Sequence, residues 1–267
     1  MNSARTTRFI ISILTICVLS TCDGLLDSTN SRLDTIDWRE GAEIVPAPED
    51  SLSAELQQAY RQDAEKLAIR YVNNSDSTET AIPSPLIDRI YNGLVHVAAS
   101  GHPKANEVTE DYQIHAQMPS HPRQVVVHVD TTAPWIGAWK NGAPDTGNEQ
   151  IDMLMEEFNL EPVSYQAVES TPNAEVKLQS DKAINVFAVG RQFRTLDYIV
   201  NAGSEGITDG NEIDVLFFSN HLRYYYTLGF GDCPSGCINS HVWVFDVYSD
   251  GTVQFVGEEG DPLENIN

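Results

Sequence analysis

One region of the chain, 124–202, restricts the fold more than any other because its hydrophobic patterns follow a fixed order. Four short segments have the alternating or continuous apolar character of strands: 124–130, 162–168, 174–178 and 198–202. Apolar residues at helical spacing follow two residues suited to capping, Asn148 and Asp181. The order is therefore strand, helix, strand, strand, helix, strand.

This order predicts an α+β fold with the split βαβ pattern of the ferredoxin-like fold. Two right-handed crossover connections would place both helices on one face of an antiparallel sheet. A long loop is expected over 131–147, with Trp135 and Trp139 in it. His128 lies among the valines of the first strand, so we expect a partly buried, hydrogen-bonded core histidine there.

The flanking sequence predicts further elements within one globular α+β domain, 51–267. Helical periodicity over 51–101 indicates two helices, the first capped by Asp50 or Ser51 and the second beginning at Ser84 and Pro85. The core, taken as 111–202, is expected to open with a strand over 111–117. Antiparallel β-hairpins are predicted over 211–257, one with a tight turn at Asp250 and Gly251.

The N-terminus has the pattern of a secretory signal peptide, 1–21. Arg5 and Arg8 precede an apolar stretch that is shorter than the about twenty residues of a membrane-spanning helix. The run Leu19-Ser20-Thr21-Cys22 resembles the lipobox of bacterial lipoproteins, although Thr21 stands where Gly or Ala is usual. The resemblance implies a lipid on Cys22 and anchoring in the bacterial cell envelope, at its periplasmic or outer-membrane face. Plain cleavage nearby and an uncleaved signal anchor are the alternatives.

Composition predicts a tether and excludes some partners. The segment 22–50 is polar and acidic, with little apolar periodicity, so we expect it to hold the domain away from the membrane. The chain has 39 acidic and 16 basic residues, for a net charge of −23. Charge of this sign repels nucleic acid and anionic lipid head groups. Beyond a lipid-mediated membrane contact, the sequence leaves the protein, peptide or envelope ligand open.

Cys233 and Cys237 suggest a rigid loop. If residues 1–21 are removed and Cys22 carries lipid, these two are the remaining thiols, and an oxidising compartment allows them to form a disulfide. The loop 229–241 would then be a rigid knob beside an aromatic-rich strand. We take as the candidate binding surface this loop and its neighbours: Tyr224, Tyr225, Tyr226, Ser235 and Trp243.

Two other uses of the cysteines stay open. Cys233, Cys237 and His241 have a regular spacing, and thiolates with an imidazole suit copper(I) or zinc. Against a zinc site, a structural zinc ion needs a fourth ligand and usually tighter spacings. Thiol redox chemistry is the other alternative, although the cysteines are one residue farther apart than in Cys-X-X-Cys enzymes.

Signatures of catalysis are absent from the sequence. It contains no Gly-x-Ser-x-Gly elbow, no His-Glu-x-x-His pair and no phosphate-binding glycine loop. The oxygen-rich run 208–214 lacks the acid pattern of an EF-hand, so we expect a solvated turn. No catalytic residue and no cofactor are indicated, and whether the chain is an enzyme stays open, with a non-enzymatic role favoured.

Two resemblances concern the folded part. The run 189–202, VGRQFRTLDYIVNA, is similar to the helix-then-strand end of subtilisin propeptide and inhibitor domains, but Gly203 and Ser204 replace that family's acidic residue and proline. This resemblance implies protease inhibition as an alternative function. The run around Cys233 and Cys237 is similar to one in bacterial lipoproteins and implies no activity. The function we expect is that of a non-catalytic binding module.

Overall fold

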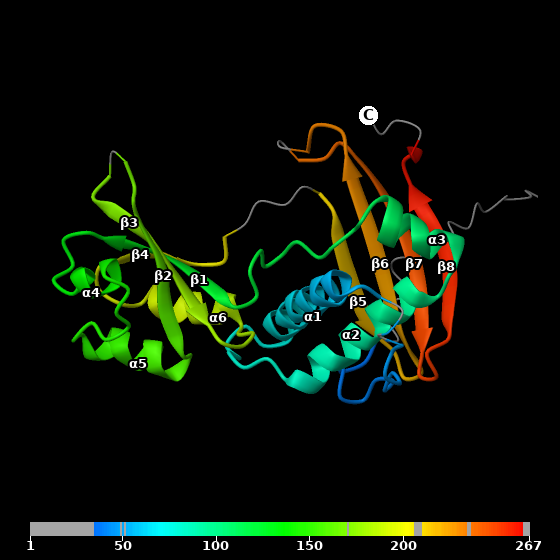
Figure 1. Cartoon of the computed structure of the whole chain (residues 1–267), viewed down its shortest axis with the longest axis horizontal. Helices are drawn as coiled ribbons and strands as arrows, with labels where there is room; N and C mark the ends of the chain where they lie inside the picture. The colour runs from blue at the N-terminus through cyan, green and yellow to red at the C-terminus, as the bar shows by residue number, and fades with distance from the viewer. Residues whose placement is uncertain are drawn as a thin grey trace, which may run out of the picture.

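The structure has two lobes, each built on a four-stranded antiparallel sheet (Figure 1). It is a computed structural model that describes residues 35–48, 50, 52–169, 171–205, 210–233 and 236–263. The predicted signal peptide, Cys22 and Ser235 lie outside these residues. Helices and antiparallel sheets together confirm the predicted α+β class.

The ferredoxin-like lobe, residues 124–203, has the predicted topology. Its elements are β1 (Gln124–Asp130), α4 (Ile136–Lys140), α5 (Glu149–Glu157), β2 (Leu160–Ala167), β3 (Asn173–Ser180), α6 (Val186–Phe193) and β4 (Ile199–Gly203). The strand order is β2-β3-β1-β4, and each neighbouring pair is antiparallel. This is the sheet of a split βαβ fold, so the prediction is confirmed.

Side chains along β1 point alternately to the two faces of this sheet. One face is covered by the helices of the lobe, and we call the other the open face. Val125, Val127 and Val129 are fully buried in a core that α5 and α6 also enter. The intervening side chains point to the other face, because successive residues of a strand alternate. His128 lies on that open face and is only partly buried. The expected partial burial is confirmed, but His128 lies outside the core, and none of the described residues hydrogen-bonds its imidazole.

Two local predictions in this lobe also need correction. The loop 131–147 contains the short helix α4, and both Trp135 and Trp139 are buried in the core. The cap of α6 is Asn185, whose side chain accepts a hydrogen bond from the Ala188 N–H, and not Asp181. Asn148 does cap α5 as predicted.

The second lobe, which we call the helix–sheet lobe, comprises the described residues of 35–117 and 210–263. Its elements are α1 (Ala54–Ser75), α2 (Ser84–Ala99), α3 (Pro103–Asn106), a π-helical turn η2 (Glu107–Asp111), β5 (Glu212–Phe217), β6 (His221–Phe230), β7 (Asn239–Tyr248) and β8 (Val253–Gly260). The strands are paired in chain order. The side chain of Ser53 caps α1, rather than Asp50 or Ser51.

The helices cover one face of this sheet (Figure 1). Along β6, buried and half-buried residues alternate, and the buried ones pack with α1 and α2 in one core. The ferredoxin-like lobe has a core of its own. The single globular domain expected over 51–267 is thus two lobes with separate cores.

The end of the predicted tether belongs to the helix–sheet lobe. Trp38, Ala42 and Ile44 are buried in its core. Backbone N–H groups of Ile36 and Ala42 donate to carbonyls at the end of β5, with N···O distances of 3.0 Å. The segment 35–48 is therefore packed against the sheet, and only the preceding part of 22–50 stays a predicted tether.

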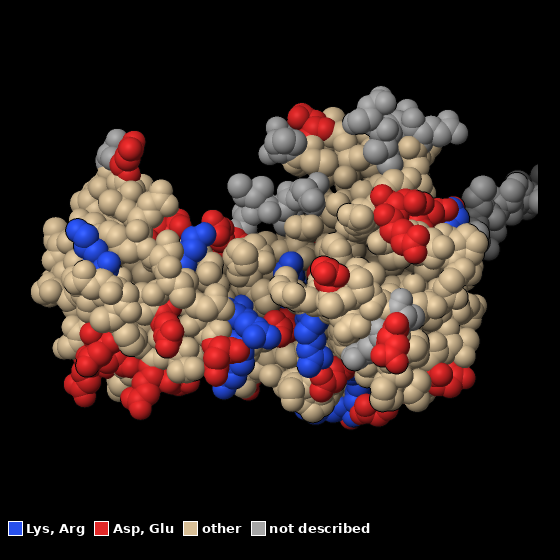
Figure 2. Space-filling model, in the orientation of Figure 1, with Lys and Arg blue, Asp and Glu red and all other residues tan. Residues whose placement is uncertain are grey.

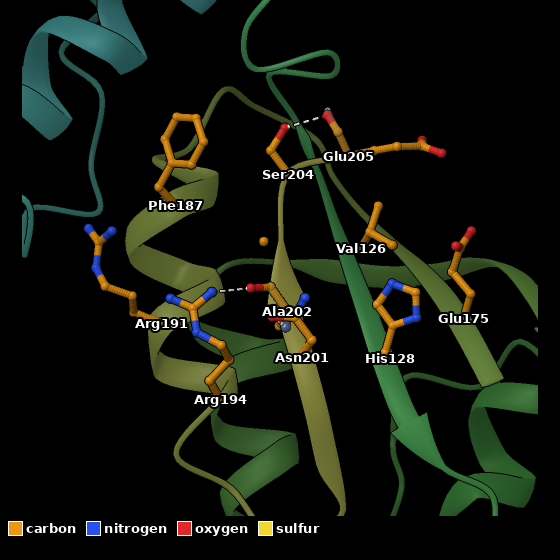
Figure 3. Close-up of a pocket in the computed structure, with 11 residues that line it drawn as sticks. Val126, His128, Glu175, Phe187, Arg191, Arg194, Asn201, Ala202, Ser204 and Glu205 are labelled. Carbon is orange, nitrogen blue, oxygen red and sulfur yellow. Dashed lines mark hydrogen bonds between the residues drawn. The ribbon is translucent and has the colours of Figure 1, made fainter. Parts of the chain in front are cut away.

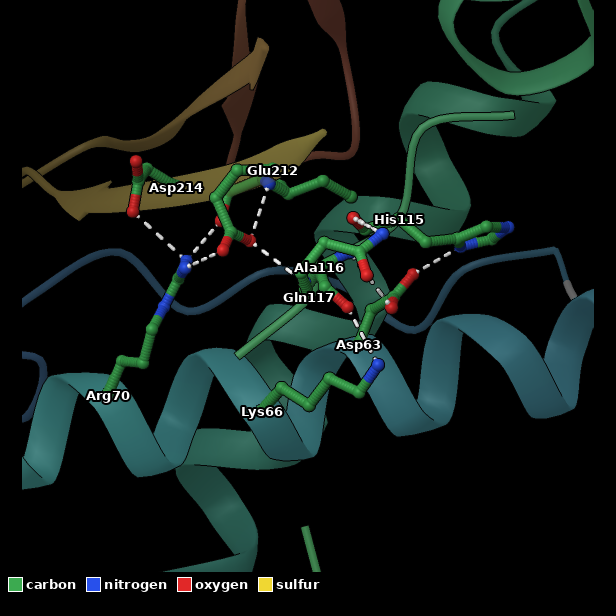
Figure 4. Close-up of polar contacts among 9 residues, drawn as sticks. Asp63, Lys66, Arg70, His115, Ala116, Gln117, Glu212 and Asp214 are labelled. Atoms are coloured by element: carbon green, nitrogen blue, oxygen red, sulfur yellow. Dashed lines mark hydrogen bonds and ion pairs between the residues drawn. The ribbon is translucent and has the colours of Figure 1, made fainter. Parts of the chain in front are cut away.

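The strand predicted over 111–117 does not form, and Figure 4 shows why. The N–H of Ala116 donates to Asp63 of α1 (3.1 Å), and the N–H of Gln117 donates to Glu212 of β5 (3.1 Å). Carboxylates therefore satisfy the backbone donors that a neighbouring strand would otherwise bind.

Candidate functional site

The aromatic residues proposed as a binding surface are mostly core residues. Tyr224, Tyr226 and Trp243 are 0% exposed. The Tyr224 hydroxyl donates to the carbonyl of Ile90 in α2 (2.9 Å), and the Trp243 indole N–H donates to Glu107 (3.1 Å). Burial raises the pKa of Tyr224 and Tyr226 well above the ordinary value. The surface predicted from these residues was therefore wrong.

Tyr225 alone among the three tyrosines points away from the helices and is half-buried. This follows from the alternation of side chains along β6. A surface centred on loop 229–241 retains too few of the predicted aromatic contacts to be the best candidate.

The cysteines are paired as a disulfide in the structure. A Cβ atom on Gly210 or Gly229 would lie 1.9 or 2.6 Å from the sulfur of Cys237, so glycine at both positions lets the disulfide approach the sheet. His241 is buried, and its Nδ1–H donates to the carbonyl of Asp261 (2.9 Å). The metal alternative needs thiolates, which this disulfide does not supply. A disulfide is equally the oxidised form of a redox pair, so the redox alternative stays a prediction.

A dense polar network connects α1 to the segment before β1 (Figure 4). Asp63 binds His115 (2.6 Å) in addition to Ala116, and Lys66 donates to the carbonyl of Ala116 (2.7 Å). Glu212 pairs with Arg70 (2.6 Å). Burial raises the pKa of Glu212, and the nearby Arg70 opposes this rise. These groups bind one another and the backbone, so the network fastens the segment in place.

A second polar cluster lies on the open face of the helix–sheet lobe. Arg223 makes two hydrogen bonds to Asp246, of 2.6 and 2.8 Å. The ring of His221 lies 3.5 Å from the same carboxylate and stacks on Phe218. Burial lowers the pKa of His221, while Asp246 raises it and Arg223 lowers it. Because both oxygens of Asp246 are engaged, this cluster is a structural ion pair.

The better candidate site is a groove along β4, which we call the α6–β4 groove (Figure 3). Its volume is about 440 Å³. It runs along the edge strand β4, with α6 on one side and side chains of the open sheet face on the other. Its walls include Val126, His128, Glu175, Phe187, Arg191 and Arg194.

Strand register places a polar row across the open face. Gln166 of β2 is opposite Glu175 of β3, Glu175 is opposite His128 of β1, and His128 is opposite Asn201 of β4. Among the described residues, none hydrogen-bonds the imidazole of His128. Three members of this row, Glu175, His128 and Asn201, line the groove, so their side chains can meet a ligand together.

Helix α6 supplies the second wall of the groove, because one side of the helix packs into the core and another side lines the groove. Val186, Val189 and Phe193 enter the core, and Phe187 is partly buried against it. Arg191 follows Phe187 one turn later on the same side of the helix. Gly190 allows α6 to approach β4 closely, since a Cβ there would lie 2.6 Å from the Cα of Gly203.

Two arginines form the basic end of the groove. Arg191 donates to the side-chain oxygen of Asn73 (3.0 Å) and to the carbonyl of Ser77 in the other lobe. Arg194 donates to the carbonyl of Ala202 in β4. These contacts fix the position of both guanidinium groups.

The described lining of the groove offers charged, hydrogen-bonding and apolar side chains. Among the described lining residues, Ser204 is the one with a hydroxyl, and that hydroxyl donates to the carbonyl of Glu205 (2.9 Å). A nucleophile would instead need a base within hydrogen-bonding reach. Within the described ranges, no group of three His, Cys, Asp or Glu residues is arranged to hold a metal ion.

The two arginines of the groove were missed in the sequence analysis. Figure 2 shows acidic side chains on both lobes and several basic ones near the middle of the molecule. Arg191 was not predicted as a site residue, and neither was Arg194. The signal was present in the sequence Gly-Arg-Gln-Phe-Arg, where two arginines fall at helical spacing between apolar positions.

The chain was also compared with known proteins. No protein family, no curated protein and no solved structure matches it. None of the helices that the structure describes is both long enough and apolar enough to cross a membrane. The site therefore has to be interpreted from its own geometry.

Proposed function

We propose that this protein is a non-catalytic binding module of the bacterial cell envelope, anchored by a lipid on Cys22, and that its ligand binds in the α6–β4 groove. The anchor rests on the lipobox-like run that ends at Cys22. The binding role rests on the groove, whose side chains come from α6 and from three strands of the open sheet face.

The observation that carries this proposal is that the open face of the ferredoxin-like sheet has a polar group without a hydrogen-bonding partner among the described residues. A polar row crosses all four strands, and within the described part of the chain its imidazole, that of His128, has no hydrogen-bonding partner. Other polar clusters are bonded internally, as in the pair of Arg223 and Asp246. Groups with free hydrogen-bonding capacity beside a concave surface are what a ligand site needs.

The anchor has a direct test. Mass spectrometry of protein isolated from membranes is expected to show a chain that begins at Cys22 and carries acyl groups. A native chain that retains residues 1–21 without an acyl group contradicts this part of the proposal.

The groove is tested by ligand screening with matched variants. We expect a thermal-shift screen of N-acetylated tripeptides, chitooligosaccharides and short fatty acids to yield binders. His128→Ala should weaken their binding about tenfold, since a hydrogen bond to a ligand contributes about 1–1.5 kcal/mol. It should leave the free energy of unfolding nearly unchanged, because the imidazole bonds to none of the described residues.

Tyr225→Ala is the control, since Tyr225 is half-buried on the open face of the other lobe. Binding is expected to survive in this variant. If ligands bind His128→Ala but no longer bind Tyr225→Ala, the site lies on the helix–sheet lobe and the proposal is wrong. A screen that yields no ligand would also count against the proposal.

A further inference from the structure

Arg191 and Arg194 differ from the other arginines that the structure describes. The others each form an ion pair with an aspartate or a glutamate: Arg39, Arg61, Arg70, Arg89, Arg123 and Arg223. Arg191 and Arg194 pair with no described carboxylate, and their protein contacts are to neutral oxygens. Both line the α6–β4 groove.

A shortage of acidic residues does not explain this difference. The chain has 39 acidic residues against 16 basic ones, so carboxylates are abundant. Two guanidinium groups, three positions apart in the sequence and on one groove, therefore have no carboxylate partner among the described residues, although the chain is rich in acidic side chains. An arginine side chain has several N–H donors in a planar fork, so each retains donors beyond its present contacts.

The other lining groups define which anion fits. Glu205 in the groove wall pairs with Lys177 (3.0 Å), and Glu175 lies 4.0 Å from the same lysine. Two carboxylates beside the site disfavour a multiply charged anion such as phosphate, because repulsion grows with ligand charge. Phe187 and Val126 add apolar surface to the same walls. The combination suits a single carboxylate attached to an apolar group.

We propose that Arg191 and Arg194 form a carboxylate-binding subsite in the α6–β4 groove, which takes a ligand with one carboxylate next to a small apolar group. This inference rests on the proposed function and specifies its ligand class. Such a carboxylate can come from the C-terminus of a peptide with an apolar last residue or from a short fatty acid. An arginine fork can donate two parallel hydrogen bonds to either source.

Four probes, titrated into the full chain by calorimetry, test whether the site needs a carboxylate and whether that carboxylate comes from a peptide or a fatty acid. They are N-acetyl-Ala-Ala-Leu with a free carboxylate, the same peptide as its C-terminal amide, hexanoate, and inorganic phosphate. We expect the free-carboxylate peptide or hexanoate to bind about ten- to a hundredfold more tightly than the amide, because hydrogen bonds to charged groups contribute about 1.5–3 kcal/mol. Which of the two binds better identifies the source. Affinity should fall as salt is raised.

Arg194→Gln is the main variant, because glutamine removes the charge and keeps a polar amide in place of the guanidinium. Arg39→Gln is its matched control, since Arg39 is an exposed arginine paired with Asp37. We expect Arg194→Gln to weaken carboxylate binding about tenfold or more with little change in Tm, and Arg39→Gln to leave it unchanged.

The two proposals fail in different ways. If the amide and the free carboxylate bind equally, or phosphate binds best, or Arg194→Gln binds the carboxylate as the wild type does, the subsite is wrong. The proposed function survives such a result if His128→Ala still removes binding. If neither His128→Ala nor Arg194→Gln changes the binding of any probe, both proposals are wrong.

Discussion

Replacing Tyr224 by alanine is expected to lower the free energy of unfolding by about 3–5 kcal/mol, the usual cost of truncating a large buried aromatic residue. Tyr224 is fully buried between β6 and α2. The truncation leaves a cavity and also leaves the carbonyl of Ile90 without the hydroxyl that now donates to it. Urea denaturation followed by circular dichroism measures the loss.

The neighbouring residue supplies the control. Tyr225→Ala should cost about 1 kcal/mol or less, because Tyr225 is half-buried on the opposite face of the strand. Equal losses at both positions would mean that the register of β6 is wrong. A larger loss at Tyr225 would mean that the faces of the sheet are exchanged.

The second large effect concerns the ion pair on the open face of the helix–sheet lobe. Asp246 is 4% exposed, and Arg223 binds both of its oxygens. Arg223→Met is expected to cost about 3–5 kcal/mol, since it leaves the buried charge of Asp246 unpaired. Asp246→Leu is expected to cost less, because the guanidinium of Arg223 that it leaves unpaired is only partly buried. The double replacement should cost less than either single one, because it leaves no unpaired charge.

A double-mutant cycle in urea at neutral pH measures this coupling. Additive losses in the double variant would show that the two side chains act independently, against the hydrogen bonds seen between them. A gain in stability on removal of either partner alone would show that the carboxylate is not buried.

Much of the fold could be predicted because it is encoded in local periodicity. The alternating valines of β1 and the apolar spacing of α5 and α6 suffice to order the elements of the ferredoxin-like lobe. Chain connectivity then restricts that order to few topologies. The alternation of Tyr224, Tyr225 and Tyr226 likewise meant that they could not share one face.

The errors arose where tertiary contacts decide the structure. Ala116 and Gln117 look like strand residues, but their N–H groups bind carboxylates that are distant in the sequence. The segment with Trp38 looks like a linker because its buried residues are few and irregularly spaced. Pairwise contacts of this kind leave no periodic signal.

The candidate site could not be predicted for a related reason. A groove forms where α6, β4 and the open sheet face converge, which only the tertiary fold determines. The arginine pair becomes informative only after every other described arginine is seen to have a carboxylate partner. The cysteine loop attracted attention instead because rare residues at short spacing are conspicuous in any sequence.

Amide chemical shifts of the isotope-labelled chain, recorded while N-acetyl-Ala-Ala-Leu is added, test the location of the ligand site most directly. The account predicts that the largest changes fall on Val126, His128, Asn201 and Gly203, with little change along β6 and β7. Changes concentrated around Cys237 and Tyr225, or no specific changes at saturating peptide, would contradict it.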